Sequence, residues 1–231
     1  MESPITERHV FDDLVSLSRA AAKETCRLLS NAISYRGEAS IVLSGGTTPK
    51  TLYSILAKDF HDEVAWDHVD FFWGDERYVP HDQIASNYYA AQQIFLSPLN
   101  ISQDRIHPIP TTFNHPADAA DSYERDLQSH FRSQNPSFDV LLLGMGADGH
   151  VASLFPGSPA LLEKERLVVV THSPAPPSTR ISLTFRAINN ASSVMILIAG
   201  NEKKEILDWI QKSEHRRTYP VSLVTGRKRL L

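Results

Sequence analysis

Short runs of apolar residues alternate along the chain with longer segments in which apolar residues recur every three to four positions. The short runs predict strands at 39–43, 69–73, 138–143, 167–171, 181–185, 194–199 and 221–224. The longer segments predict helices at roughly 12–35, 48–59, 86–96, 117–133 and 202–212, with a short helix between residues 150 and 156. This alternation is typical of an α/β fold, so we expect a mostly parallel, Rossmann-like sheet flanked by helices.

The length and the continuity of this pattern favour a single domain. The chain has 231 residues, which is enough to bury a sizeable core. We find no internal repeat, no low-complexity tract and no convincing linker between segments. We therefore expect one domain over residues 1–231.

Charge and cysteine content exclude several classes of protein. The net charge of −4 argues against a nucleic-acid partner, which usually requires a basic surplus. The first residues lack a basic start and an apolar run, and the other apolar runs are too short for a bilayer. We expect a cytoplasmic protein without a membrane partner, either a monomer or a small homo-oligomer. The single cysteine, Cys26, lies in a helical pattern and is expected to be a buried structural thiol.

Four of the predicted strands end in clusters of glycine and polar residues. In an open parallel sheet, ligands bind beyond the carboxyl ends of the strands. We therefore expect these four clusters to lie on the same side of the sheet, where they would supply amide donors, carboxylates, an imidazole and cations. The clusters are 44–46, 74–77, 144–150 and 200–203.

The first cluster suits a phosphate group. Gly45 and Gly46 let the backbone approach a ligand closely, and the helix that follows offers free N–H groups and the positive end of its dipole. Ser44, Thr47 and Thr48 add hydroxyl groups. The segment lacks the Gly-Lys-Ser/Thr ending of a Walker A loop, so a nucleoside triphosphate is not expected. A plain strand–helix turn with a threonine cap explains this segment equally well.

The third cluster contains the strongest candidate for catalysis. Residues 144–149 fit the spacing G-x-G-x-x-G, but a dinucleotide site is not favoured because Pro156 and Gly157 stop the following helix early. The glycines more simply shape a tight turn that presents Asp148 and His150. A histidine titrates near neutral pH, and a carboxylate beside it can fix its tautomer. We therefore interpret His150 as a general base that Asp148 orients.

Further candidates are charged residues at the other strand ends. Arg77 could bind an anionic group with two hydrogen bonds, and Asp75 could bind sugar hydroxyls or orient a cation. Arg180 and Lys203 are further candidates for anion binding. Taken singly, each of these residues could equally be a solvated surface group. No set of cysteines and histidines has metal-ligand spacing, so we expect no required metal.

Taken together, the motifs resemble the 6-phosphogluconolactonase family. The resemblance is most specific in the Asp-Gly-His-x-Ala-Ser-Leu-Phe-Pro stretch at 148–156 and covers nearly the whole chain in the family's order. The matching segments are 44–49, 73–77, 86–88, 143–157, 178–183 and 199–203. The resemblance implies a place in the oxidative pentose phosphate pathway, a phosphorylated sugar lactone as substrate, and no cofactor. It also implies that His150 activates water while the Ser44–Thr48 segment, Arg180 and Lys203 hold the phosphate, although Arg77 could contact the phosphate instead.

Two alternatives remain open at this stage. The same fold family includes glucosamine-6-phosphate isomerase/deaminase, in which the Asp-Gly-His loop continues to Asn-Glu-Pro and the glutamate is catalytic. Here Phe155 stands in place of that glutamate, which favours the lactonase. A sugar-phosphate sensor of related fold would need a DNA-binding module, and no segment of the sequence is basic and long enough to form one.

Overall fold

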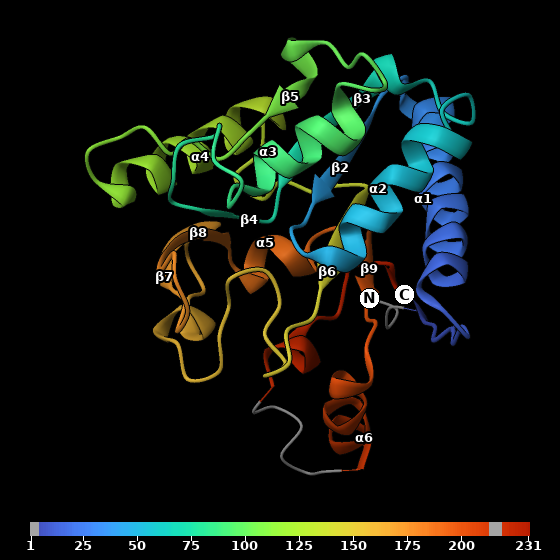
Figure 1. Ribbon diagram of the computed structural model, residues 1–231. Helices are drawn as coiled ribbons and strands as arrows, with labels where there is room; N and C mark the ends of the chain where they lie inside the picture. Colours follow the sequence, from blue (N-terminus) through green and yellow to red (C-terminus); the bar gives the residue numbers. More distant parts are fainter. Residues whose placement is uncertain (1–4, 213–218) are drawn as a thin grey trace.

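A parallel sheet forms the centre of the fold. The computed structural model describes residues 5–212 and 219–231. Within these residues seven strands join into one sheet, and every neighbouring pair is parallel (Figure 1). Across the sheet their order is β1 (Ile5–Thr6), β10 (Arg229–Leu230), β9 (Ser193–Leu197), β6 (Val140–Gly144), β2 (Ala39–Leu43), β3 (Val69–Trp73) and β5 (Ile106–His107). The expected α/β fold with a mostly parallel sheet is confirmed.

The direction in which the chain fills the sheet reverses between β2 and β6. From β2 the chain proceeds to β3 and β5 on one side, and then crosses back to β6, β9 and β10 on the other. At such a reversal the connections leave the two central strands in opposite directions, which opens a crevice at their carboxyl ends. The fold therefore offers a ligand site where Leu43 and Gly144 end their strands.

Helices cover both faces of the sheet. Successive residues of a strand point to opposite faces, and β3 shows which helix lies on each. The Phe71 ring packs against Phe95, which stacks on Tyr53 of α2, whereas the Phe72 ring packs against His130 of α4. The α-helices are α1 (Leu14–Arg36), α2 (Thr47–Asp59), α3 (Asn87–Ala91), α4 (Pro116–His130), α5 (Phe185–Asn189) and α6 (Lys204–Lys212). A π-helical turn, η2, continues α3 over Gln92–Leu96.

A second, smaller sheet lies beside the main one. It consists of β4 (Asp75–Arg77), β8 (Thr179–Leu183) and β7 (Val168–His172), in the order β4-β8-β7, and both pairings are antiparallel. The sequence predicts two of these strands but does not separate them from the parallel sheet. It interprets Asp75–Arg77 as a loop, because three polar residues carry no apolar pattern.

Two predicted elements are wrong. No helix forms between residues 150 and 156, where the chain makes turns closed by an isolated bridge between Val151 and Leu154. The predicted strand at 221–224 is instead a 3-10 turn, η7 (Pro220–Leu223), and the last strand is β10. In both places a short apolar run is buried without regular pairing. Such a run is too short for its hydrophobic periodicity to distinguish a helix or a strand from a turn.

The structure buries Cys26, as expected, and shows how apolar its helices are. Cys26 is buried on α1, and desolvation raises the pKa of its thiol to about 12, so the thiol is an inert part of the core. Among the helices in the described part of the chain, none combines the length and the apolar character needed to cross a membrane.

Two buried tyrosines fix the carboxyl ends of β2 and β3. The Tyr53 hydroxyl on α2 accepts a hydrogen bond from the Ser44 amide at 2.8 Å and donates one to the Ser44 carbonyl at 2.8 Å. The Tyr123 hydroxyl on α4 accepts a hydrogen bond from the Trp73 amide at 3.0 Å and donates one to the Trp73 carbonyl at 3.1 Å. Each phenol therefore satisfies both backbone groups of a residue at the end of its strand. Since the two helices cover opposite faces, the carboxyl edge is held from both sides.

We predict that Tyr53→Phe and Tyr123→Phe each lower the free energy of unfolding by about 1–3 kcal/mol. The reason is that each change leaves a buried amide and carbonyl without their partner. Chemical denaturation measures the loss, and Tyr35→Phe is the matched control because Tyr35 is 86 % exposed. Equal stabilities for the two buried variants and the control would contradict this role of the hydroxyls.

Candidate active site

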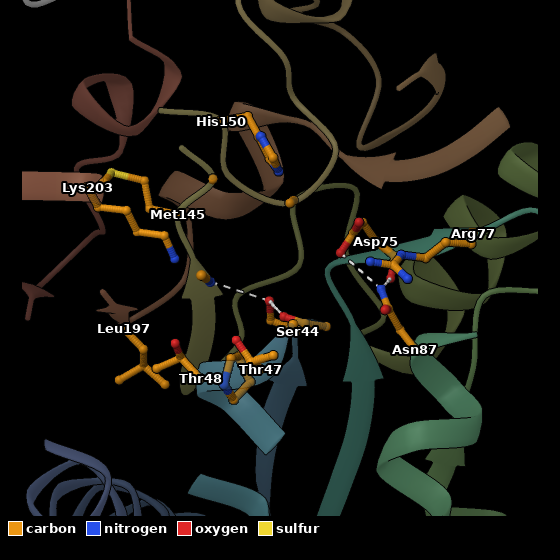
Figure 2. A pocket seen from close by; sticks show the side chains of 16 residues that line it. Ser44, Thr47, Thr48, Asp75, Arg77, Asn87, Met145, His150, Leu197 and Lys203 are labelled. Carbon is orange, nitrogen blue, oxygen red and sulfur yellow. Dashed lines mark hydrogen bonds between the residues drawn. The ribbon is translucent and has the colours of Figure 1, made fainter. Parts of the chain in front are cut away.

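A pocket opens at the reversal point of the sheet, over the carboxyl ends of β2 and β6. Figure 2 shows Ser44 at its floor, His150 at one end, and Lys203 and Arg77 entering from opposite sides. The Ser44 hydroxyl lies 3.4 Å from the Gly144 amide and so joins the two strand ends. The pocket is lined by Ser44, Gly45, Gly46, Thr47, Thr48, Pro49, Asp75, Arg77, Asn87, Gly144, Met145, Gly146, His150, Ala152, Leu197 and Lys203. The four clusters at strand ends thus meet on one side of the sheet, as expected.

The Ser44–Thr48 segment forms the turn from β2 into α2. Gly46 has a φ of 104°, a conformation that favours glycine, and α2 begins immediately after it at Thr47. Gly45 is also required by space, because a Cβ there would lie 2.0 Å from Oδ1 of Asn87. The first turn of α2 therefore presents backbone N–H groups and the positive end of the helix dipole to the pocket, which suits an anion.

His150 and Asp148 form a hydrogen-bonded pair at the rim. Nδ1 of His150 lies 2.6 Å from Oδ1 of Asp148, and the same oxygen accepts the His150 amide at 3.1 Å. Burial alone would raise the pKa of Asp148, but the hydrogen bonds from His150 outweigh it and hold the pKa below its usual value. An ionised Asp148 accepts a hydrogen bond from Nδ1–H of His150, which leaves the Nε2 lone pair of the ring free to take a proton.

The glycine-rich turn holds the imidazole in place. A Cβ on Gly146 would lie 2.2 Å from Nδ1 of His150, so only glycine leaves room for the ring. On its other side, the His150 ring packs against Phe155 with 4.5 Å between the centroids. Because no helix follows this turn, the segment also lacks the helix N-terminus on which a dinucleotide pyrophosphate would rest.

Asp75 is a buried carboxylate facing the pocket. It is 6 % exposed, and Oδ2 accepts a hydrogen bond from the Ser153 hydroxyl at 2.6 Å. Oδ1 lies 3.3 Å from Nδ2 of the Asn87 side chain. These contacts fix the carboxylate, and its remaining lone pairs can accept ligand hydroxyls.

The three candidate cations differ in their access to the pocket: two line it and the third is buried beside it. Arg77 lines the pocket and donates from Nη1 to the Ala85 carbonyl at 2.8 Å. Lys203 lines the pocket from the opposite side in Figure 2. Arg180 is paired with Arg77 across β4 and β8, is buried, and is not among the lining residues. Burial and the neighbouring charge of Arg77 lower the pKa of Arg180, and within the described ranges its Nε has no hydrogen-bond partner.

Glu76 organises one wall of the pocket although it does not line it. This carboxylate is 1 % exposed and accepts hydrogen bonds from the amides of Arg77, Asn87 and Tyr88 at 2.7, 2.7 and 2.8 Å. The Ser86 hydroxyl donates a further one at 3.0 Å. Burial raises the pKa of Glu76, and the four hydrogen bonds oppose that shift because they favour the ionised form. Glu76 therefore ties β4 to the start of α3.

The structure brings most of the predicted site residues together. Asp148 does not line the pocket and contacts His150, and Arg180 lies beside Arg77 on the neighbouring strand, also outside the lining. Sequence reasoning missed the contributions of Glu76 and Asn87. Ser86 is recognised as a helix cap and accepts from the Tyr89 amide at 3.1 Å, but no pattern shows that Asn87 reaches the pocket or that Glu76 is buried.

The fold and the site together define an α/β protein in which the turn before α2 and a His–Asp pair open on one pocket. The sequence profile of the family described as glucosamine-6-phosphate isomerases/6-phosphogluconolactonase matches residues 12–231. The chain belongs to this family.

Individual relatives agree with that assignment. The 6-phosphogluconolactonase of Synechocystis sp. is 38 % identical over 94 % of this chain and 90 % of its own length. That of Nostoc sp. is 43 % identical over 78 % of this chain and 74 % of its own. The crystal structure of 6-phosphogluconolactonase from Thermotoga maritima is 30 % identical, has a TM-score of 0.84, and covers 98 % of this chain and 97 % of that one.

We predict that Glu76→Gln lowers the free energy of unfolding by about 1–3 kcal/mol. The new NH₂ group replaces a carboxylate oxygen, so at least one buried backbone N–H faces a donor and loses its acceptor. Denaturant titration measures the effect against Glu165→Gln, which removes the same charge from an exposed position. If both variants are as stable as the unmodified protein, Glu76 does not tie β4 to α3 as the distances indicate.

Proposed function

We propose that this protein hydrolyses 6-phospho-D-glucono-1,5-lactone to 6-phosphogluconate, a step of the oxidative pentose phosphate pathway. The names of the relatives support this substrate. The observation that carries the proposal is that the His150–Asp148 pair and the Ser44–Thr48 turn open on one pocket. A base at one end and an anion site at the other match a sugar lactone with its reactive carbonyl and its phosphate at opposite ends.

The proposed chemistry is general acid–base hydrolysis. Nε2 of His150 takes a proton from water as the water oxygen attacks the lactone carbonyl carbon. The tetrahedral intermediate then breaks its bond to the ring oxygen, which receives the proton from the imidazolium. Asp148 stabilises the imidazolium and keeps the ring oriented. Because water is the only co-reactant, the reaction needs no redox or group-transfer cofactor. We propose that no metal takes part, because His150 supplies the base that activates the water.

Two further groups assist in this proposal. Negative charge develops on the carbonyl oxygen during attack, and backbone N–H groups of the glycine-rich turn or the Arg77 guanidinium would stabilise it. Asp75, which Ser153 and Asn87 hold in place, would accept hydrogen bonds from hydroxyls of the sugar.

The phosphate would be bound by the first turn of α2 and by cations. The backbone N–H groups and the hydroxyls of Ser44, Thr47 and Thr48 surround one part of the pocket, and Lys203 lies in its lining. Arg180, buried beside Arg77 on the neighbouring strand, would add positive potential to this side of the pocket. We therefore propose Lys203 as the direct cationic contact and Arg180 as the second.

The glucosamine-6-phosphate isomerase/deaminase alternative is not supported by the position of Phe155. Its apolar ring packs on His150, where the deaminase pattern has a catalytic glutamate. An assay for ammonia release from glucosamine-6-phosphate tests this point directly. Release at the rate at which the lactone is hydrolysed would replace our proposal with the deaminase.

We predict that His150→Gln and His150→Ala reduce kcat by about 10²–10⁴-fold, the usual contribution of a positioned general base. Acid production from freshly prepared 6-phosphogluconolactone measures the rate after the spontaneous hydrolysis is subtracted. His172→Gln is the control, because His172 is exposed at the end of β7. Near-normal turnover in both His150 variants would rule out the general-base role.

We predict that Lys203→Ala weakens binding of the phosphorylated lactone by about tenfold or more, since one charge-assisted contact is worth ~1.5–3 kcal/mol. Hydrolysis of unphosphorylated gluconolactone should change little, because that substrate never uses the contact. Arg180→Ala and Arg77→Ala are compared on both substrates, and Lys204→Ala is the control at a neighbouring exposed lysine. An equal loss on both lactones would show that Lys203 serves the fold or the chemistry instead.

A further inference from the structure

A second group of histidine and carboxylate side chains lies away from the pocket. Asp70 of β3, His107 of β5 and His130 of α4 place three potential metal-ligand atoms within 4.8 Å of one another. Asp70 precedes Trp73, the end of β3, by three residues, which is about 10 Å along a strand. The cluster is therefore near the amino end of the strand, and none of its members lines the pocket at the carboxyl edge.

The distances within the cluster suit a small divalent ion. With ligands at about 2.0–2.1 Å, a tetrahedral zinc site separates its ligand atoms by about 3.3 Å. Nε2 of His107 lies 2.9 Å from Oδ1 of Asp70, and Nε2 of His130 lies 3.9 Å from Oδ2. The two imidazoles thus approach different oxygens of one carboxylate, one at less and one at more than this separation. Within residues 5–212 and 219–231, the ring nitrogens of His130 make no hydrogen bond, so His130 approaches the carboxylate without one.

Packing holds both imidazoles in position and leaves a route from solvent. The His107 ring stacks on Phe72 with a centroid distance of 4.6 Å and an interplanar angle of 14°. The His130 ring meets the same phenyl edge-on at 5.1 Å. The Asp70 side chain is 4 % exposed, whereas those of His107 and His130 are 27 % and 29 % exposed. The ligand atoms are thus preorganised by an apolar partner, and an ion can reach them.

We propose that Asp70, His107 and His130 form a binding site for a borderline first-row divalent metal ion, with Zn²⁺ as the preferred probe. Two imidazoles and one carboxylate provide three ligands that such ions accept, and water completes the coordination. Coordination through Nε2 replaces the hydrogen bond between His107 and Asp70, and the neutral ring then carries its proton on Nδ1. The site is structural and joins β3, β5 and α4, and it is separate from the proposed lactonase chemistry.

Arg105 provides a way to distinguish a metal site from an ion-pair network. Its Nη1 lies 3.0 Å from Oδ2 of Asp70, so the guanidinium now neutralises the carboxylate that the metal would use. If the cluster is a metal site, removal of this competing cation strengthens metal binding. If the cluster is only an ion-pair network, Arg105→Gln removes a stabilising contact and gives zinc no advantage.

The experiment uses the full chain after treatment with a chelator and removal of the chelator. Zinc chloride is titrated calorimetrically, bound zinc is counted by elemental analysis, and the thermal midpoint is recorded. We expect one zinc per chain, a higher thermal midpoint in its presence, and at least about tenfold weaker binding in His107→Gln and His130→Gln. We expect tighter binding in Arg105→Gln, and no change in His172→Gln. Far-UV circular dichroism of the zinc-free variants checks that each one folds.

Three results would overturn the proposal. The first is the absence of saturable binding near one equivalent. The second is unchanged affinity in the double variant His107→Gln/His130→Gln. The third is loss of the site in His150→Gln, which would place the ion at the pocket instead. Zinc binding is measured without substrate, so failure of the lactonase proposal leaves this test intact.

Discussion

The buried carboxylate of Glu76 is the interaction on which the site depends. A carboxyl group with almost no contact with water is tolerated only where hydrogen-bond partners satisfy its oxygens, and here four donors do so. Three of these donors are backbone amides, so the carboxylate fixes the course of the chain as well as side chains. Through it β4 leaves the main sheet beside α3, which brings Asp75, Arg77 and Asn87 to one wall of the pocket.

The shape of the pocket also depends on how β2 and β3 end. The hydroxyls of Tyr53 and Tyr123 satisfy the backbone of Ser44 and Trp73 from opposite faces, where the sheet no longer provides partners. The turns that follow can then be shaped for ligand contact because the strand ends are held by other groups. The rigid edge carries the glycine-rich turns, and the space that Gly45 and Gly146 leave is filled by Asn87 and His150.

We propose different roles for two pairings of histidine with aspartate in this fold. Asp148 and His150 are two residues apart in one turn, half exposed, and they open on the pocket. Asp70 and His107 are 37 residues apart and come from neighbouring strands, and the His107 ring stacks on Phe72. The first arrangement leaves a ring nitrogen free for a proton, and the second directs its nitrogens at one shared carboxylate. Similar chemical groups thus suit proton transfer in one place and metal binding in the other.

The sequence by itself determined the α/β class, most of the strands and helices, and the turn that joins Asp148 to His150. These features are local: a hydrophobic period, a glycine turn and two side chains within three residues. Only the tertiary structure decided that Arg180 is buried beside Arg77, that Glu76 and Asn87 build the wall of the pocket, and that Asp70, His107 and His130 meet. It also decided that β4, β7 and β8 form their own sheet and that the apolar runs near residues 150–156 and 221–224 are irregular. Most of these outcomes rest on contacts between residues well separated in the chain, and no period or spacing along the sequence encodes them.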